Sequence, residues 1–203
     1  MGGMGKTKLT ERFRAAVHYA LEAHAKQERK GSGVPYATHI LGTAAIALHF
    51  GGTEEQAIAA LLHDAAEDQG GRWRLADIRR RFGANVARIV EGCTDTLEDP
   101  KPPWEPRKRA YIERISKEED DEVRFVSAAD KLDNARAIVA DLRQQGAAVW
   151  RRFKGGERSL WYYDQLVKAF RAAGTNPLVE ELAVAVREMR RLARRAKPPG
   201  RAP

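Results

Sequence analysis

The segment AALLHDAAEDQ, residues 59–69, places a histidine and three acids directly after an apolar run. Ile58 to Leu62 are all apolar, which predicts the middle of a buried helix. Burying an ionised carboxylate without a partner costs several kcal/mol. The side chains that therefore need a partner are His63, Asp64, Glu67 and Asp68.

Helical spacing dominates the chain on both sides of this segment. Thr53, followed three residues later by Gln56, predicts a capping box for a helix that carries residues 63–68 at its C-terminal end. Nothing alternates with a period of two residues, so we expect an all-α fold, a multi-helix bundle. The other expected helices cover residues 8–28, 36–50, 75–81, 84–92, 107–116, 121–145, 157–173 and 177–196.

Residues 97–106, LEDPKPPWEP, interrupt this pattern with acids and prolines. Proline removes a backbone donor and disfavours helix, so we expect this stretch to be a non-helical, mobile loop near a site. Cys93 is the single cysteine of the chain and cannot form an internal disulfide. We expect it to pack in the core.

Length and composition are typical of one soluble globular domain. The 203 residues are 43% hydrophobic and 32% charged. We expect a single domain over residues 1–203, with a core at about 8–175, a basic helix at 177–196 and a disordered tail at 197–203. No apolar run approaches the roughly 20 residues that span a bilayer, and the N-terminal stretch lacks the features of a secretory signal. These features predict a cytoplasmic protein without a membrane partner.

The net charge of +8 is concentrated near the C-terminus. From Arg187 onward the chain has seven basic residues and one acid, Glu188. Such a stretch is more often a solvated helix face than a nucleic-acid site, so we do not expect a nucleic-acid partner. Residues 2–7, GGMGKT, imitate the end of a phosphate-binding loop but lack its first glycine and a preceding strand.

Polar groups also occur at apolar positions of two other helices. Asp130 and Asn134 continue the apolar stripe of residues 121–142, and His39 begins an otherwise apolar helix. Each has a structural explanation when taken alone, such as a hydrogen-bonded core histidine or an aspartate paired with a buried arginine. Two histidines and two aspartates satisfy one another, however, if a divalent cation lies between them. A metal site would account for His39, His63, Asp64 and Asp130 together.

The polar segments together resemble a known family. RKGSGVPYATH (residues 29–39), HDAAED (63–68) and DKLDN (130–134) are similar to the hydrolase domain of the RelA/SpoT homologues, within the HD superfamily of metal-dependent phosphohydrolases. The likeness covers about residues 10–170. It implies an HD-domain bundle that acts as a stand-alone small alarmone hydrolase in the stringent response, without the synthetase and regulatory domains of the long RelA/SpoT proteins.

The resemblance implies a role for each matched residue. The usual metal of the family is Mn²⁺, and the positions that match its ligands are His39, His63, Asp64 and Asp130. Glu67 and Asp68 match the acidic pair that handles the attacking water, a role that suits carboxylates beside a cation. The positions that match substrate contacts are Arg29, Lys30, Lys108, Asn134, Arg158 and Tyr162. For Lys108, Arg158 and Tyr162 a structural or solvated role is an equal alternative.

The implied activity is removal of the 3′-diphosphate from the guanosine alarmones (p)ppGpp, yielding GDP or GTP and pyrophosphate. Alternatives are hydrolysis of (p)ppApp or of the phosphate of NADPH, a non-catalytic nucleotide- or nucleic-acid-binding module, and an antitoxin-like partner of a cognate alarmone synthetase. Asp133 stands where the family usually has an aromatic residue or a histidine, so the base preference stays open. The oligomeric state stays open as well, a homo-oligomer included.

Overall fold

The computed structural model describes residues 7–98 and 100–195. Within these ranges no strand forms, and Glu28 and Pro35 make one isolated antiparallel bridge. The all-α prediction is confirmed, while the expected tail at 197–203 lies outside the described residues. The helices are α1 (Glu11–Ala23), α2 (Ala37–His49), α3 (Glu54–Leu62), α4 (Ala65–Asp68), α5 (Gly71–Cys93), α6 (Trp104–Ser116), α7 (Asp121–Gln145), the 3-10 helix η1 (Gly146–Arg152), α8 (Arg158–Ala173) and α9 (Pro177–Arg195).

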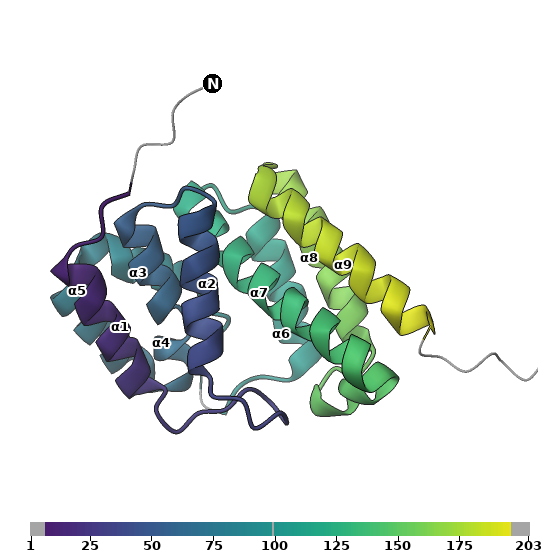
Figure 1. The fold of residues 1–203 in the computed structure, drawn as a ribbon. Coiled ribbons are helices and arrows are strands. Elements are labelled where there is room, and N and C mark those ends of the chain that lie inside the picture. Colours follow the sequence, from purple (N-terminus) through teal and green to yellow (C-terminus); the bar gives the residue numbers. More distant parts are fainter. Residues whose placement is uncertain (1–6, 99, 196–203) are drawn as a thin grey trace, which may run out of the picture.

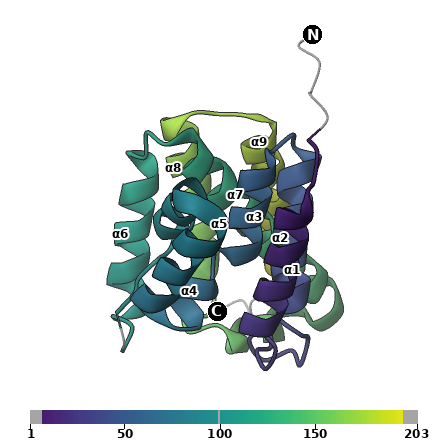
Figure 2. The same cartoon turned by 90° about the vertical axis from the view of Figure 1, so that its left-hand side faces the viewer.

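Helix α7 runs through the middle of the bundle (Figure 1). It packs against α2, α3 and α5 on one side and against α9 and η1 on the other, while α6 pairs with α8. Seen from the side, α6 and α1 stand at opposite edges of the molecule (Figure 2). The fully buried side chains that fill the space between the helices include Ile40, Leu61, Leu132, Phe170 and Leu182. Burial of this apolar surface is the main force that holds the bundle together.

Side chains cap the N-termini of α3 and α7. The Thr53 side chain accepts a hydrogen bond from the Gln56 amide, and the Gln56 side chain accepts one from the Thr53 amide, so the predicted capping box is present at α3. The Asp120 carboxylate accepts hydrogen bonds from the amides of Glu122 and Val123 at the start of α7. These caps satisfy amides that lack partners within the helix.

Several predicted helix boundaries are wrong. The helix capped by Thr53 ends at Leu62, and a separate short helix, α4, follows it. The helix expected over residues 8–28 spans only Glu11–Ala23, because His24 leaves the helical conformation and bonds the Gln27 side chain through Nδ1. The proline-rich stretch is partly helical, since α6 begins at Trp104. Pro106 lies in its first turn, where the missing amide hydrogen needs no partner.

Helix α5 joins the two short helices that were expected over 75–81 and 84–92. Gly83 has φ 90° and ψ 165°, so the run from Gly71 to Cys93 bends there. Glycine tolerates a positive φ that other residues rarely adopt, which accounts for the break that the sequence pattern indicated. The 3-10 helix η1 has no counterpart in the predictions.

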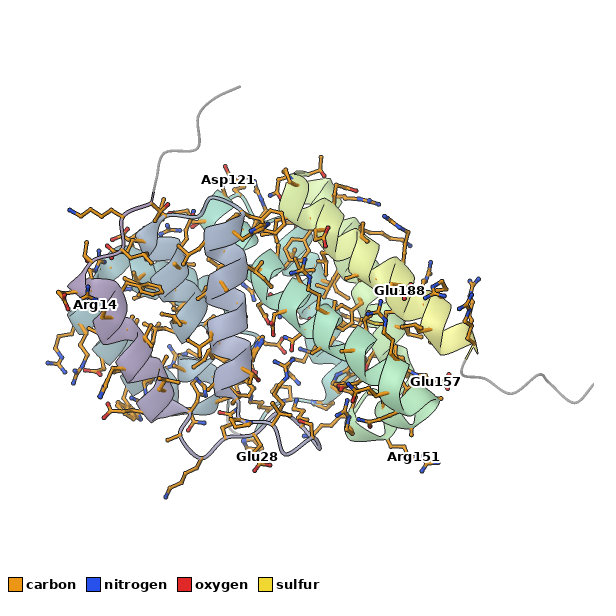
Figure 3. All side chains as sticks on the ribbon, viewed as in Figure 1. Arg14, Glu28, Asp121, Arg151, Glu157 and Glu188 are labelled. Atoms are coloured by element: carbon orange, nitrogen blue, oxygen red, sulfur yellow. The ribbon has the colours of Figure 1, made fainter. Side chains whose placement is uncertain are left out.

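Helix α9 has an apolar side and a basic side. Leu178, Leu182 and Met189 are buried, whereas the arginines of this helix are exposed. Glu188, which lies among them in sequence, is labelled in Figure 3. Arg190 pairs with Asp164 at 2.7 Å. No helix in the described ranges combines the length and the apolar character that crossing a lipid bilayer requires.

Candidate metal centre

The His-Asp pair lies at the junction of α3 and α4. His63 is the C-terminal cap of α3, and Asp64 is the N-terminal cap of α4. The chain turns at this point, and His63 Nε2 comes to lie 2.9 Å from Asp64 Oδ2. His63 keeps helical backbone angles, φ −57° and ψ −35°, and Asp64 departs from them moderately, with φ −96° and ψ −7°.

His39 of α2 and Asp130 of α7 complete the cluster. His39 Nε2 lies 3.3 Å from Asp130 Oδ1 and 3.5 Å from Asp64 Oδ2. His63 Nε2 lies 3.7 Å from Asp130 Oδ1. His39, His63 and Asp130 each offer one possible ligand atom, and these three atoms lie within 4.8 Å of one another. The structure thus brings together all four side chains that the sequence singles out as metal ligands.

The two histidines present unpaired nitrogens to this centre. Both side chains are only 1% exposed, yet neither Nε2 has a hydrogen-bond partner. The Nδ1 of His63 donates to the carbonyl oxygen of Ala60 at 2.8 Å, and the Nδ1 of His39 lies 2.6 Å from Asp133 Oδ2. When Nδ1 carries the hydrogen, the lone pair of Nε2 is available for a ligand. Two imidazole nitrogens and two carboxylates are a donor set that fits a divalent cation.

The charges of the cluster are mutually dependent. Burial alone would lower the pKa of His39, but the carboxylates of Asp130, Asp133 and Asp64 raise it to about 9, so a cation that binds Nε2 would displace a proton. Burial opposes ionisation of Asp130, yet the charge of Lys131 and the imidazoles hold its pKa well below the usual value. Burial likewise acts against Asp64, whose pKa the neighbouring imidazoles hold well below its usual value. Both carboxylates are ionised at neutral pH, as a ligand role requires.

The acidic pair after the His-Asp dyad is held by a lysine. Lys101 Nζ lies 2.8 Å from Glu67 Oε1 and 2.8 Å from Asp68 Oδ1. The amide of Asp95 donates to Glu67 Oε2 at 3.0 Å, and the Gln27 side chain donates to Asp68 at 2.9 Å. Lys101 belongs to the proline-rich stretch, so that stretch does lie beside the site. The sequence analysis did not identify Lys101 itself, because it predicted only that the loop containing this residue lies near a site.

A second group of cations and phenols lies on α6, α7 and α8. Lys131 forms an ion pair with Asp130, and its Nζ lies 4.9 Å from the centre of the Tyr111 ring. Lys108 Nζ lies 5.0 Å from the centre of the Tyr162 ring. The hydroxyl groups of Tyr111 and Tyr162 are buried without a hydrogen-bond partner. The structure therefore places Lys108 and Tyr162 together, and it adds Lys131 and Tyr111, which sequence reasoning missed.

The remaining predicted substrate contacts fall into two groups. Arg29 donates to Asn134 Oδ1 at 3.0 Å, and Asn134 Nδ2 donates to Asp130 Oδ1 at 2.6 Å, so both adjoin the metal cluster. Lys30 is exposed in the loop between α1 and α2, whose position Glu28 marks in Figure 3. Arg158 is 59% exposed and pairs with Glu105 of α6.

Comparisons with known proteins agree with this arrangement. The sequence model of a family described as HD domain, HD_4, matches residues 16–158. Guanosine-3′,5′-bis(diphosphate) 3′-pyrophosphohydrolase MESH1 of Danio rerio is 37% identical over 168 residues, which cover 81% of this chain and 86% of the relative. The Homo sapiens protein of the same name is 35% identical, over 82% of this chain and 87% of its own length. A solved structure, described as a metazoan orthologue of SpoT that hydrolyses ppGpp, superposes with a TM-score of 0.74 at 28% identity. It covers 90% of this chain and 97% of its own.

Proposed function

The chain belongs to the HD-domain family, and from this we propose that it is a metal-dependent guanosine-3′,5′-bis(diphosphate) 3′-pyrophosphohydrolase. The resemblance carried by the three polar segments is thereby confirmed at the level of the family. The proposed reaction converts ppGpp and water into GDP and pyrophosphate. Relatives that cover more than four fifths of the chain bear this activity in their names.

One observation carries the proposal: two buried Nε2 atoms without hydrogen-bond partners face two ionised carboxylates. Leaving buried polar atoms unsatisfied costs free energy unless a ligand pairs with them. The proposed ligands are His39, His63, Asp64 and Asp130, and the proposed ion is Mn²⁺. Such an ion neutralises phosphate oxygens and makes a nearby water more acidic.

Glu67 and Asp68 assist the attack of water on the substrate in the proposed reaction. The water oxygen bonds to the phosphorus next to the ribose 3′ oxygen, the bond between that phosphorus and the ribose oxygen breaks, and the ribose oxygen receives a proton. Glu67 and Asp68 are placed one turn after the His-Asp dyad, where they orient the water and accept its proton. Lys101 holds both carboxylates in place through contacts of 2.8 Å.

Binding of the diphosphate needs fixed positive charge. Lys131 and Lys108 lie beside the ligand Asp130 and the phenol of Tyr162, where they offset the charge of the leaving pyrophosphate. Arg29 and Asn134 hold the nucleoside, since a guanidinium plane stacks on a base and an amide bonds ribose hydroxyls.

A panel of nucleotides tests the proposed substrate. We expect purified protein with Mn²⁺ to release pyrophosphate from ppGpp and pppGpp, leaving GDP and GTP, measured by chromatography of the products. ppApp, NADPH and ordinary nucleoside triphosphates are the comparison substrates. Preferential release of pyrophosphate from ppApp, or of orthophosphate from NADPH, would assign the site to those substrates instead, and no turnover of any member would contradict the enzymatic proposal.

Removal of the metal tests the site without substrate. Binding to the folded state alone stabilises it by about 2.7 kcal/mol at a ligand concentration 100 times Kd. For a chain of this size that corresponds to a rise in Tm of roughly 5–10 °C. We expect Mn²⁺ to raise the Tm of chelator-treated protein by this amount in differential scanning fluorimetry. An equal Tm with and without Mn²⁺ would argue against a metal held by these four residues.

A further inference from the structure

Asp133 of α7 connects the metal centre to the arginine that faces the nucleotide. Its Oδ2 lies 2.6 Å from His39 Nδ1 and 3.1 Å from an NH1 nitrogen of Arg29. The second terminal nitrogen of Arg29 donates to Asn134, and Asn134 donates to Asp130. Because Asp130 Oδ1 lies 3.3 Å from His39 Nε2, the five side chains close a ring of polar contacts.

Gly42 of α2 provides the space that the Asp133 carboxylate occupies. A Cβ atom at position 42 would overlap Asp133 Oδ1. The carboxylate therefore lies against the backbone of α2, three residues after His39 on the same helix. Glycine in the middle of a helix is unfavourable compared with alanine, so this close approach is a specific reason for its presence there.

The charge of Asp133 is compensated within the ring. The side chains of Asp133 and Arg29 are both 19% exposed, and their ion pair removes the repulsion that a lone acid would exert on substrate phosphates. Asp133, which replaces the residue usual in the family, therefore contacts Arg29 and His39, which lie 104 and 94 residues away in sequence.

We propose that Asp133 is a positioning residue: it holds the His39 ring so that Nε2 faces the metal, and it fixes the Arg29 guanidinium beside the nucleotide. The proposal rests on the metal site of the proposed function. A carboxylate that accepts the hydrogen of a metal-binding imidazole sets the ring orientation and raises its basicity, and losing it lowers metal affinity 10- to 100-fold in known sites. The second role follows from the paired contacts, since Asp133 and Asn134 together orient the two ends of the guanidinium.

Two substitutions of Asp133 separate the two roles. We expect Asp133→Leu to weaken Mn²⁺ binding about 10- to 100-fold, measured on substrate-free protein from the electron paramagnetic resonance signal of free Mn²⁺. Asp133→Asn retains an oxygen that accepts from His39, so its Mn²⁺ affinity should stay within about threefold of the wild type. Both variants lose the charged partner of Arg29 and should raise KM for ppGpp roughly fivefold. A merely structural role would not separate metal affinity from KM in this way.

A third variant displaces the Asp133 carboxylate without replacing Asp133 itself. Gly42→Ala leaves His39 and Asp133 in the chain and favours helix, but its methyl group displaces the carboxylate. We expect it to weaken Mn²⁺ binding in the same direction as Asp133→Leu, while the helix preference of alanine offsets part of the stability lost with the displaced contacts. It keeps the proposal testable if Asp133→Leu fails to fold. The matched control is Asp164→Leu, because Asp164 is a similarly buried aspartate, 18% exposed, that pairs with an arginine of α9, Arg190.

The outcomes distinguish this proposal from the proposed function. Asp133→Leu and Gly42→Ala proteins that bind Mn²⁺ within threefold of the wild type would overturn the positioning role. Wild-type protein that binds Mn²⁺ but leaves ppGpp intact would contradict the proposed function, while the affinities alone would still decide the role of Asp133. Wild-type protein that binds no Mn²⁺ would overturn both.

Discussion

Asp64→Ala is expected to lower the rate of pyrophosphate release from ppGpp by about 1,000-fold and to abolish measurable Mn²⁺ binding. Asp64 Oδ2 lies 2.9 Å from His63 Nε2 and 3.5 Å from His39 Nε2, so its removal leaves two imidazoles with one carboxylate. Charge stabilisation by a bound cation is worth several kcal/mol in the transition state, and about 4 kcal/mol corresponds to this factor. Initial rates and Mn²⁺ titrations measure the two effects.

Asp77→Ala is the matched control for Asp64→Ala. Asp77 is also a mostly buried aspartate, with a side chain 15% exposed against 20% for Asp64, and each carboxylate accepts a hydrogen bond from a tyrosine hydroxyl. It lies on α5 and contacts arginines of the surface, so Asp77→Ala should keep its Mn²⁺ affinity. Normal turnover by a folded Asp64→Ala protein would rule out Asp64 as a ligand.

Glu67→Gln is expected to lower kcat by about 10²- to 10⁴-fold and to leave Mn²⁺ affinity within a few-fold of the wild type. The substitution keeps the size of the side chain and an oxygen that can accept from the Asp95 amide, which lies 3.0 Å from Glu67 Oε2 in the wild-type protein. It removes the charge that accepts a proton from water, and general base catalysis contributes about this factor. Single-turnover rates at saturating Mn²⁺ separate the chemical step from metal binding.

Glu113→Gln serves as the control for the loss of a glutamate–lysine pair. Glu113 pairs with Lys117 at 2.7 Å, close to the 2.8 Å that separates Glu67 from Lys101, but it lies on the exposed side of α6. Its turnover should equal that of the wild type. A Glu67→Gln protein that loses Mn²⁺ as completely as Asp64→Ala would mean that Glu67 is a metal ligand rather than a base.

The metal cluster could be anticipated from the sequence because buried polar groups need partners. His39 and Asp130 each stand in an apolar helix stripe, and His63 follows an apolar run, so the pattern identified them one by one. Helical periodicity likewise predicted most of the bundle. The break after Leu62 escaped prediction because buried alanines at Ala65 and Ala66 continue the apolar pattern across it.

The parts that escaped prediction depend on contacts between distant segments. Lys101 reaches Glu67 across 34 residues, and Asp133 reaches His39 across 94. Local spacing carries no information about such pairs, and a lysine in a charged loop is indistinguishable from its solvated neighbours. Gly42 is the same kind of case, since only the packing of α2 on α7 shows that its missing side chain makes room for Asp133.

Four side chains with proposed roles lie within five consecutive residues of one helix, α7: the proposed metal ligand, a cation, the proposed positioning acid and an amide. They are Asp130, Lys131, Asp133 and Asn134. One helix carries all four, so a small rotation of α7 about its axis would shift them together. Substitutions on the opposite, core-facing side of α7 should therefore change metal affinity, KM and kcat in concert, and their effects should combine non-additively with changes at the four positions.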